Sequence, residues 1–176
     1  MTSWISKMTG NGLALENLEN VLTLQLRDLY SAELQLIKAL PKMAKAAHNQ
    51  ELKTAFESHL KETEQQKIRL EQAFELLGQT PEKETCEAMQ GLISEGEEII
   101  GLEGEPDVKD AALIAAAQRV EHYEIAGYGC ARTFARRLGR AEIAKLLQHT
   151  LDEESNADVI LTDIAEAMVN TQAAQS

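Results

Sequence analysis

Apolar residues recur at steps of three and four along most of this chain, and this spacing restricts it to helices. The clearest example is a leucine series in the first third of the sequence, at positions 15, 18, 22, 26, 29, 36 and 40. Because an α-helix turns once every 3.6 residues, such a series lies along one helix face. It predicts a first amphipathic helix over about 13–47.

Three further stretches have the same periodicity. The second helix, which follows a polar turn at 48–50, has Leu52, Phe56 and Leu70 on its apolar face, and GQTP at 78–81 ends it with a glycine and a proline. A third helix is expected over about 107–138 and a fourth over about 141–169. Four glycines interrupt the segment between the second and third helices, where we expect a modest helix near 84–100.

Two helical hairpins of similar length, about 13–77 and 107–169, are therefore joined by some 29 residues. A short turn makes antiparallel neighbours, whereas a long connection can cross the length of a bundle. We expect an all-α fold, a ferritin-like four-helix bundle over 13–169 of two antiparallel hairpins joined by a long crossover that contains the short helix. An up-down-up-down bundle with a long loop is the alternative. Residues 1–12 are expected to be flexible, and the tail 170–176 to fray.

The net charge of the protein excludes some classes of binding partner. Twenty-nine acidic and 17 basic residues give a net charge of −12, so we expect neither nucleic acid nor a membrane surface as a partner. The sequence has no run of about 18 apolar residues to span a membrane, and its first residues lack the apolar segment of a secretory signal. Cys86 and Cys130 are isolated and are expected to stay reduced, which favours a cytoplasmic protein.

Each long helix also carries polar residues on the side that should be buried. The seven residues of this kind are Glu33, His59, Glu62, Glu121, Glu124, Glu154 and Asp158. Glu33 is 16 residues before position 49 and Glu62 is 13 after it, so their heights differ by roughly 4.5 Å at a rise of about 1.5 Å per residue. Glu124 and Glu154 differ by about one residue when counted from the second turn. We therefore expect one polar layer at the middle of the bundle.

Several carboxylates at one level of a core cannot all stay ionised without partners, because burial and mutual repulsion raise their pKa values. Oxygen-rich sites with some imidazole suit iron or manganese, and glutamates from four helices are how a bundle holds two such ions. We therefore predict that these seven residues form a metal site for two iron or manganese ions per chain. The alternatives are boundary glutamates that reach solvent and a histidine that is only hydrogen-bonded in the core.

Small and aromatic residues near the layer have expected supporting roles. Tyr30, Tyr123 and Tyr128 are expected to pack in the bundle, with hydroxyl groups that bond the carboxylates. Gly127 and Gly129 are expected to let a neighbouring helix approach closely.

The sequence resembles a known family in four blocks. They are DLYSAELQLIKALPKMAKAA (28–47), AFESHLKETEQQKIRLEQAF (55–74), DAALIAAAQRVEHYEIAGYG (110–129) and LLQHTLDEESNAD (146–158). These blocks resemble the YciF/YciE-like proteins, the DUF892 branch of the ferritin-like superfamily, and the likeness covers about 16–169. It implies a ferritin-like or rubrerythrin-like bundle, a homodimer formed through helix faces and a link with bacterial stress responses, with no settled biochemical activity.

The resemblance also implies a ligand set. Superfamily relatives hold two iron or manganese ions with one glutamate each from the first and third helices and a Glu-x-x-His from the second and fourth. Carried over to this chain, the single glutamates are Glu33 and either Glu121 or Glu124, and the bridging ones are Glu62 and Glu154. The chain departs from this pattern, because Gln65 and Ala157 occupy the two histidine positions and the second helix has the reverse order, His59-x-x-Glu62.

Two functions are consistent with these observations. The first is a ferritin-like stress protein whose carboxylate-rich metal site could oxidise Fe(II) with peroxide or oxygen. The second is a non-catalytic dimeric stress or scaffold protein that keeps the bundle and has a protonated, hydrogen-bonded polar core without metal. The sequence leaves open whether the protein is an enzyme. Hydrolysis is not expected, because the sequence has no Ser/His/Asp arrangement and no phosphate-binding glycine loop.

Overall fold

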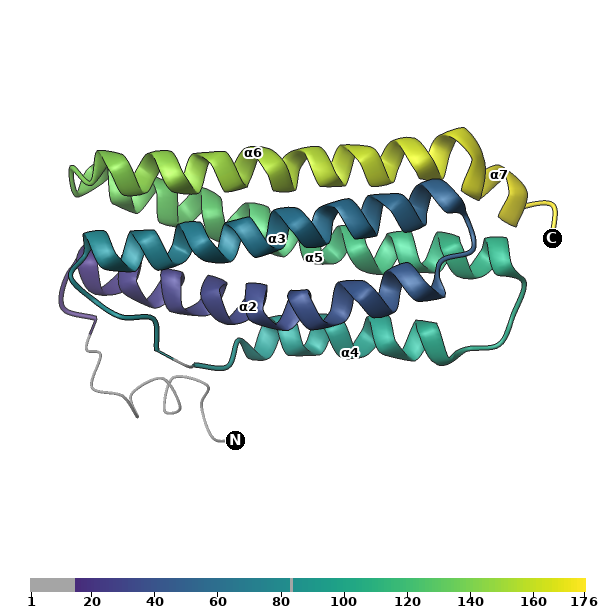
Figure 1. Cartoon of the computed structure of the whole chain (residues 1–176), viewed down its shortest axis with the longest axis horizontal. Helices are drawn as coiled ribbons and strands as arrows, with labels where there is room; N and C mark the ends of the chain where they lie inside the picture. Colours follow the sequence, from purple (N-terminus) through teal and green to yellow (C-terminus); the bar gives the residue numbers. More distant parts are fainter. Residues whose placement is uncertain (1–14, 83) are drawn as a thin grey trace.

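The computed structural model describes residues 15–82 and 84–176, and every regular element in this part of the chain is helical. Four long helices lie side by side, α2 (Leu18–Ala46), α3 (Gln50–Leu76), α5 (Pro106–Arg137) and α6 (Ala141–Ile164) (Figure 1). The shorter helix α4 (Glu87–Gly101) packs against α2 and α5. The all-α prediction is thus confirmed. The predicted flexible segment 1–12 lies outside the described residues.

The long helices form two hairpins. A short turn joins α2 to α3 and another joins α5 to α6, and the hairpins meet where α2 packs on α5 and α3 packs on α6. The connection between α3 and α5 runs back along the molecule and contains α4 (Figure 1). Because of this connection, α5 runs antiparallel to α2 and α6 runs antiparallel to α3. The predicted hairpins and the helix in their connection are therefore both present.

The turn of the first hairpin is held from both sides. The side chain of Asn49 caps α3 by accepting hydrogen bonds from the backbone N–H groups of Glu51 and Leu52, at 2.9 and 3.1 Å. The buried carboxylate of Asp110, on α5, accepts hydrogen bonds from the backbone N–H groups of His48 and Asn49, at 2.9 and 2.5 Å. A residue of the second hairpin thus stabilises the turn of the first hairpin.

Glycines end two helices and allow one close contact. Gly78 and Gly139 follow α3 and α5 with φ angles of +69° and +70°, a left-handed conformation that favours glycine. A Cβ atom on Gly127 would lie 2.8 Å from Cδ2 of Leu29, so α5 approaches α2 closely there, as predicted. The same prediction for Gly129 is wrong, because a Cβ atom there would have no neighbour within 4 Å among the atoms of the described chain.

The core consists of two apolar clusters, one toward each end of the bundle. One includes Leu22, Leu26, Phe74, Ala135 and Leu147. The other includes Leu40, Leu52, Phe56, Ile114 and Leu161. The buried polar residues Glu33, His59, Glu121, Glu124 and Glu154 lie between them in sequence on their helices, at the predicted mid-bundle level.

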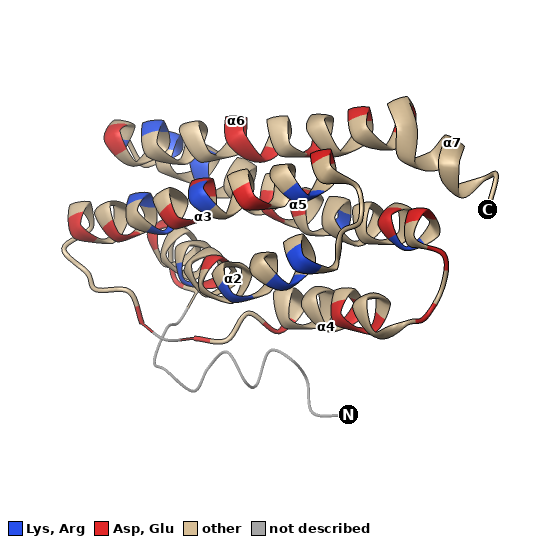
Figure 2. Ribbon diagram, turned by 45° about the vertical axis from the view of Figure 1, so that its right-hand side comes forward, with Lys and Arg blue, Asp and Glu red and all other residues tan. Residues whose placement is uncertain are grey.

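The last helix continues past the expected end. A π-helical turn, η2 (Ala165–Val169), follows α6 and leads into the short helix α7 (Asn170–Ala173). The segment 170–176 thus begins in helix, and its fraying stays a prediction. Acidic residues occur on every helix from α2 to α6, so the negative charge is not confined to one element (Figure 2). Within the described residues, none of the helices combines the length and the apolarity that a membrane crossing requires.

Candidate metal centre

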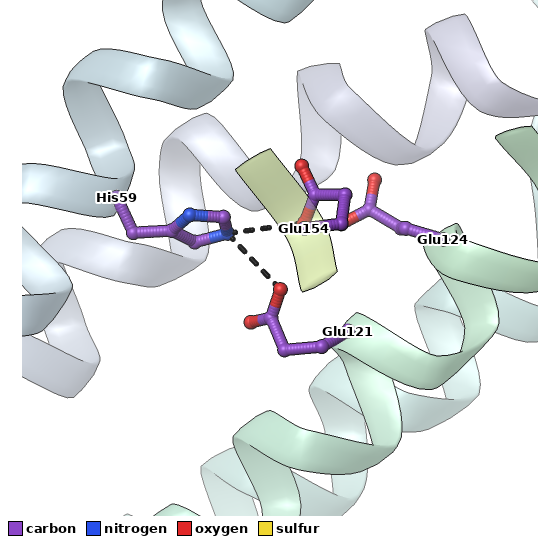
Figure 3. Close-up of side chains that lie close together, drawn as sticks. All are labelled: His59, Glu121, Glu124 and Glu154. Atoms are coloured by element: carbon purple, nitrogen blue, oxygen red, sulfur yellow. Dashed lines mark ion pairs between the residues drawn. The ribbon is translucent and has the colours of Figure 1, made fainter. Parts of the chain in front are cut away.

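Four of the predicted residues form a compact buried group. His59 from α3, Glu121 and Glu124 from α5, and Glu154 from α6 each offer one ligand atom, and these atoms all lie within 4.8 Å of one another. His59 points across the bundle toward Glu121 and Glu154 (Figure 3). Its Nε2 atom lies 3.4 Å from Oε2 of Glu121 and 3.6 Å from Oε2 of Glu154. Residues far apart in sequence thus converge as the counting from the turns predicted.

Glu33 extends this group to the remaining long helix, α2. Its side chain has no solvent exposure, and the hydroxyl of Tyr128 donates a hydrogen bond to its Oε1 atom. Its Oε2 atom has no hydrogen-bond partner in the described chain. Burial raises the pKa of Glu124 and repulsion from Glu33 raises it further, so the two carboxyl groups belong to one interacting cluster. We call Glu33, His59, Glu121, Glu124 and Glu154 the polar layer.

Glu62 lies at the rim of the polar layer rather than inside it. Its side chain is 39% exposed, and its Oε2 atom lies 3.3 Å from Nδ1 of His59. The imidazole of His59 therefore faces a carboxylate with each of its ring nitrogens, the partly exposed Glu62 on one side and buried Glu121 and Glu154 on the other.

The structure does not bring Asp158 into the layer. Its Oδ1 atom lies 3.3 Å from Nε2 of the exposed His122 and accepts a hydrogen bond from Nε2 of Gln118 at 3.2 Å. Asp158 therefore takes part in a contact between α5 and α6 near the surface.

Only one of the three tyrosines makes the predicted hydrogen bond to the polar layer. Tyr128 bonds a carboxyl group of the layer, as expected. Tyr30 and Tyr123 bond other carboxylates, since Tyr30 donates to Glu71 at 2.9 Å and Tyr123 donates to Asp28. For these two residues the expectation of a bond to the layer is wrong.

Gln66 is a member of the site that the sequence analysis did not identify. It is fully buried on α3, and its Nε2 atom donates hydrogen bonds to Glu154 and, at 3.2 Å, to Oε2 of Glu153. Glu153 also accepts two hydrogen bonds of 2.6 Å from the guanidinium of Arg69. The available signal was the spacing, because Gln66 follows His59 by seven residues and so lies on the same helix face.

Burial keeps protons on three carboxyl groups of the polar layer, those of Glu33, Glu124 and Glu154. It raises the pKa of Glu33 to about 8, although the hydrogen bond from Tyr128 acts in the opposite direction. Burial is also the main reason why the pKa values of Glu124 and Glu154 lie well above the ordinary range, and the neighbouring carboxylates add to it. Without a cation, the layer therefore holds carboxyl protons at neutral pH.

The imidazole of His59 is protonated like these carboxyl groups, but its proton makes it a cation. Burial alone would lower its pKa, but the negative charge of Glu121 and the hydrogen bond with Glu62 outweigh burial and raise the pKa to about 9. A cationic imidazole thus takes the place that a metal cation would occupy among the carboxylates.

Unpaired ligand atoms collect in this one place. In the described chain, buried side-chain oxygen and nitrogen atoms without a hydrogen-bond partner occur on six residues here, Glu33, His59, Gln66, Glu121, Glu124 and Glu154, and outside this site only on Nε of Arg27 and of Arg132. A buried polar atom without a partner costs roughly 1–3 kcal/mol, so a group that pairs with these atoms stabilises the fold. A bound cation would satisfy several of them at once, and a set of carboxylates with one imidazole suits iron or manganese.

Known proteins resemble this chain over most of its length. The family described as "Domain of unknown function (DUF892)" matches residues 17–174. Protein YciF of Escherichia coli (strain K12) is 48% identical over 160 residues, which are 90% of this chain and 96% of that protein. The crystal structure of the Escherichia coli stress protein YciF matches with a TM-score of 0.86 and 47% identity, over 89% of this chain and 99% of that chain.

Two further solved structures are similar. YcfI of Rhodopseudomonas palustris, described as a candidate structural protein, matches with a TM-score of 0.82 and 43% identity, over 87% of this chain and 96% of that chain. A protein of Xanthomonas campestris pv. campestris matches with a TM-score of 0.71 over 90% of this chain and 98% of that chain. At 23% identity, this last match shows a shared fold alone.

Proposed function

Because the chain belongs to the DUF892 family, as its four sequence blocks predicted, we propose that it is a ferritin-like stress protein that binds two iron or manganese ions in its polar layer. One observation carries this proposal, the convergence of buried, unpaired ligand atoms from all four long helices. The two hairpins and their long crossover support the ferritin-like part of the proposal. A relative, YciF of Escherichia coli, is called a stress protein, and we extend that role to this chain.

The charge of the layer fits two divalent cations. Four glutamates of the layer are at most 2% exposed, and they carry four negative charges when they are deprotonated. Two divalent cations carry four positive charges, so the filled site would be neutral and tolerable in an apolar core. His59 and Glu62 are the remaining candidate ligands. They could make up for part of the two histidines that the superfamily pattern has and this chain lacks.

Redox chemistry is the activity that such a site would support. Iron held by carboxylates supplies one-electron chemistry toward peroxide or oxygen. Fe(II) would be the substrate and the small oxidant its co-substrate. The protein's own part would be to hold the ions away from bulk water and to release the carboxyl protons that the cations displace.

Metal analysis tests the proposal. The protein is purified without chelator, loaded with Fe(II) under argon or with Mn(II), desalted and measured by mass spectrometry of its metals. We expect about two ions per chain, and a large loss for the Glu124→Gln variant, because a site of this kind depends on its charged ligands. An occupancy below about a tenth of an ion per chain in the loaded wild type would overturn it, since a native-state ligand must bind to have a role.

The second candidate is a non-catalytic stress or scaffold protein with a protonated polar core. It is favoured by the hydrogen bonds from Tyr128 to Glu33 and from Gln66 to Glu154, which can hold the two carboxyl groups without metal. It predicts that combining Glu33→Gln with Glu154→Gln leaves stability unchanged or raised, and that added metal leaves the melting temperature unchanged. In both cases we expect a cytoplasmic homodimer formed through helix faces, which light scattering can test.

A further inference from the structure

A groove between α3 and α6 leads from the surface of the bundle to the polar layer. It has a volume of about 420 Å³. On the α3 side it is lined by Glu51, Thr54, Ser58 and Glu62, and on the α6 side by apolar residues that include Ile160. Because Thr54, Ser58 and Ile160 are exposed, the outer part of the groove is open to solvent.

Two buried ligand atoms lie at the inner end of the groove. His59 and Glu121 both line it, although their exposures are only 6% and 2%. Nε2 of His59 and Oε2 of Glu121 have no hydrogen-bond partner in the described chain, and they lie 3.4 Å apart. The groove therefore ends on an imidazole and a carboxylate, and a cation that reaches them takes the place of the imidazole proton.

The charge of the groove selects a cation. Three carboxylates line it, those of Glu51, Glu62 and Glu121, and among the described residues along its walls the imidazole of His59 is the one cationic group, with no Lys or Arg. A concave surface with charges of one sign concentrates ions of the opposite sign. Glu62 stands where the groove meets the layer, because it is 39% exposed and still lies 3.3 Å from Nδ1 of His59.

A second cavity reaches the same two side chains but is unsuited to a hydrated ion. It lies beneath α4, has a volume of about 40 Å³ and is lined mainly by apolar residues such as Leu36, Leu92 and Ile93. A space of this size holds only a few molecules as small as water, and apolar cavities tend to stay dry. A divalent cation with part of its water shell fits the groove and not this cavity.

We propose that the groove between α3 and α6 is the route by which a divalent cation reaches the polar layer, and that Glu62 is the first carboxylate to bind the incoming ion. This inference rests on the metal binding proposed above, and it assigns Glu62 a role in transfer that differs from that of the buried ligands. Entering ions exchange their waters for carboxylate oxygens at Glu62 before they reach the more deeply buried His59 and Glu121.

Rapid mixing of the metal-free protein with Co²⁺, followed by the visible absorption of the bound ion, tests the route. Ser58→Trp places a large side chain in the exposed groove wall without removing a predicted ligand. A blocked route slows both directions, so we expect association and dissociation to slow about tenfold each, with equal affinity and stoichiometry. The matched control is Ser155→Trp, an exposed serine beside Glu154 that does not line the groove, and it should bind at the wild-type rate.

Two more variants complete the test. Glu62→Gln should slow association and weaken its dependence on salt, because it removes a charge that attracts the cation. Gly96→Leu fills the cavity beneath α4, where a Cβ atom would meet only Sδ of Met43 at 3.8 Å, and it should leave the rate unchanged.

The outcomes separate the two proposals. If the wild type binds no Co²⁺, the metal site itself is wrong. If it binds Co²⁺ and Ser58→Trp associates at the wild-type rate, or if Gly96→Leu alone is slow, the site stands and the route through the groove is overturned.

Discussion

The two sides of the polar layer place the same kind of side chain in different surroundings. On the side of α2, Glu33 and Glu124 have no solvent exposure, and the buried Tyr128 of the apolar core donates a hydrogen bond to Glu33. On the side of α3, His59 and Glu121 are also buried, but they line a groove that opens to solvent past Glu62. We call these the sealed side and the open side. The difference teaches that the carboxyl groups of the sealed side must be neutralised by protons or by bound cations. The groups of the open side can exchange both protons and cations with water.

The largest expected effect is the response of the metal-free protein to pH. Because the folded pKa of Glu33, about 8, lies above its unfolded value, the folded state binds more protons and loses stability as pH rises toward 8. The same holds for His59, whose stabilisation is complete below its unfolded pKa near 6.5 and is lost as pH rises through about 9. Denaturation of chelator-treated protein should show stability falling by on the order of 4 kcal/mol between pH 6 and 9.

Glu33→Gln is the control for this pH effect. It removes a titrating group of the sealed side and should flatten the curve below pH 8, while the fall due to His59 on the open side remains. A stability that is constant or rises between pH 6 and 9 in the metal-free wild type would contradict the description of the layer. Bound metal should reverse the trend, because its ligands must be deprotonated.

The next largest effect should come from the close contact behind the sealed side. Gly127→Leu forces a side chain against Leu29, and overpacking of this kind should cost about 3 kcal/mol in denaturant unfolding. The matched control is Gly129→Leu, on the same helix but without a neighbour, which should gain about 0.5 kcal/mol from helix propensity. Equal stabilities of the two variants would show that α2 and α5 are not closely packed at this level.

A smaller effect is expected for the hydroxyl group that bonds the sealed side. Tyr128→Phe keeps the ring in the apolar core but leaves Glu33 without its donor, and it should cost about 1.5 kcal/mol in the same experiment. Tyr30→Phe removes a hydroxyl bonded to Glu71 in a half-buried place and should cost below about 0.5 kcal/mol. A larger loss for Tyr30→Phe than for Tyr128→Phe would reverse the comparison.

The smallest effect on stability should come from the open side. Glu62→Gln should change the free energy of unfolding by less than about 0.5 kcal/mol, because a partly exposed ion pair contributes little. The same substitution at the buried Glu124 should change it more, in either direction, since that carboxyl group has no hydrogen-bond partner in the described chain. Equal effects at Glu62 and Glu124 in parallel denaturation curves would remove the distinction between the two sides.

The helices and the level of the polar layer followed from the sequence, because both depend only on helical period and rise. Counting residues from the two turns brought Glu33, Glu124 and Glu154 to one height without knowledge of how the hairpins pack. Helix rotation was harder to predict. A step of three residues leaves Glu62 about 60° around the helix from His59, which places it at the rim of the layer, whereas Gln66, seven residues on, lies within about 20° of His59 and faces the centre with it.

Other features depend on contacts between elements that no local pattern encodes. Asp158 is one turn from Glu154 on the same helix, yet it is drawn to Gln118 and His122 on the neighbouring α5. The groove arises from the spacing of α3 and α6, which is set by side chains from both hairpins. The position of α4 against α2 and α5 likewise depends on the path of the connection, for which the sequence predicted a helix but not where this helix docks.

The carboxylate of Asp110 also bears on the order in which a growing chain can finish its fold. It accepts a hydrogen bond from the backbone N–H group of Asn49, a residue 61 positions earlier in the chain. The first hairpin is therefore synthesised well before the hydrogen bonds of its turn can be completed. Until α5 arrives, this turn depends on water for the N–H groups of His48 and Asn49. These hydrogen bonds couple the two hairpins into one cooperative unit. A fragment that ends before Asp110 would form the first hairpin without the carboxylate that stabilises its turn.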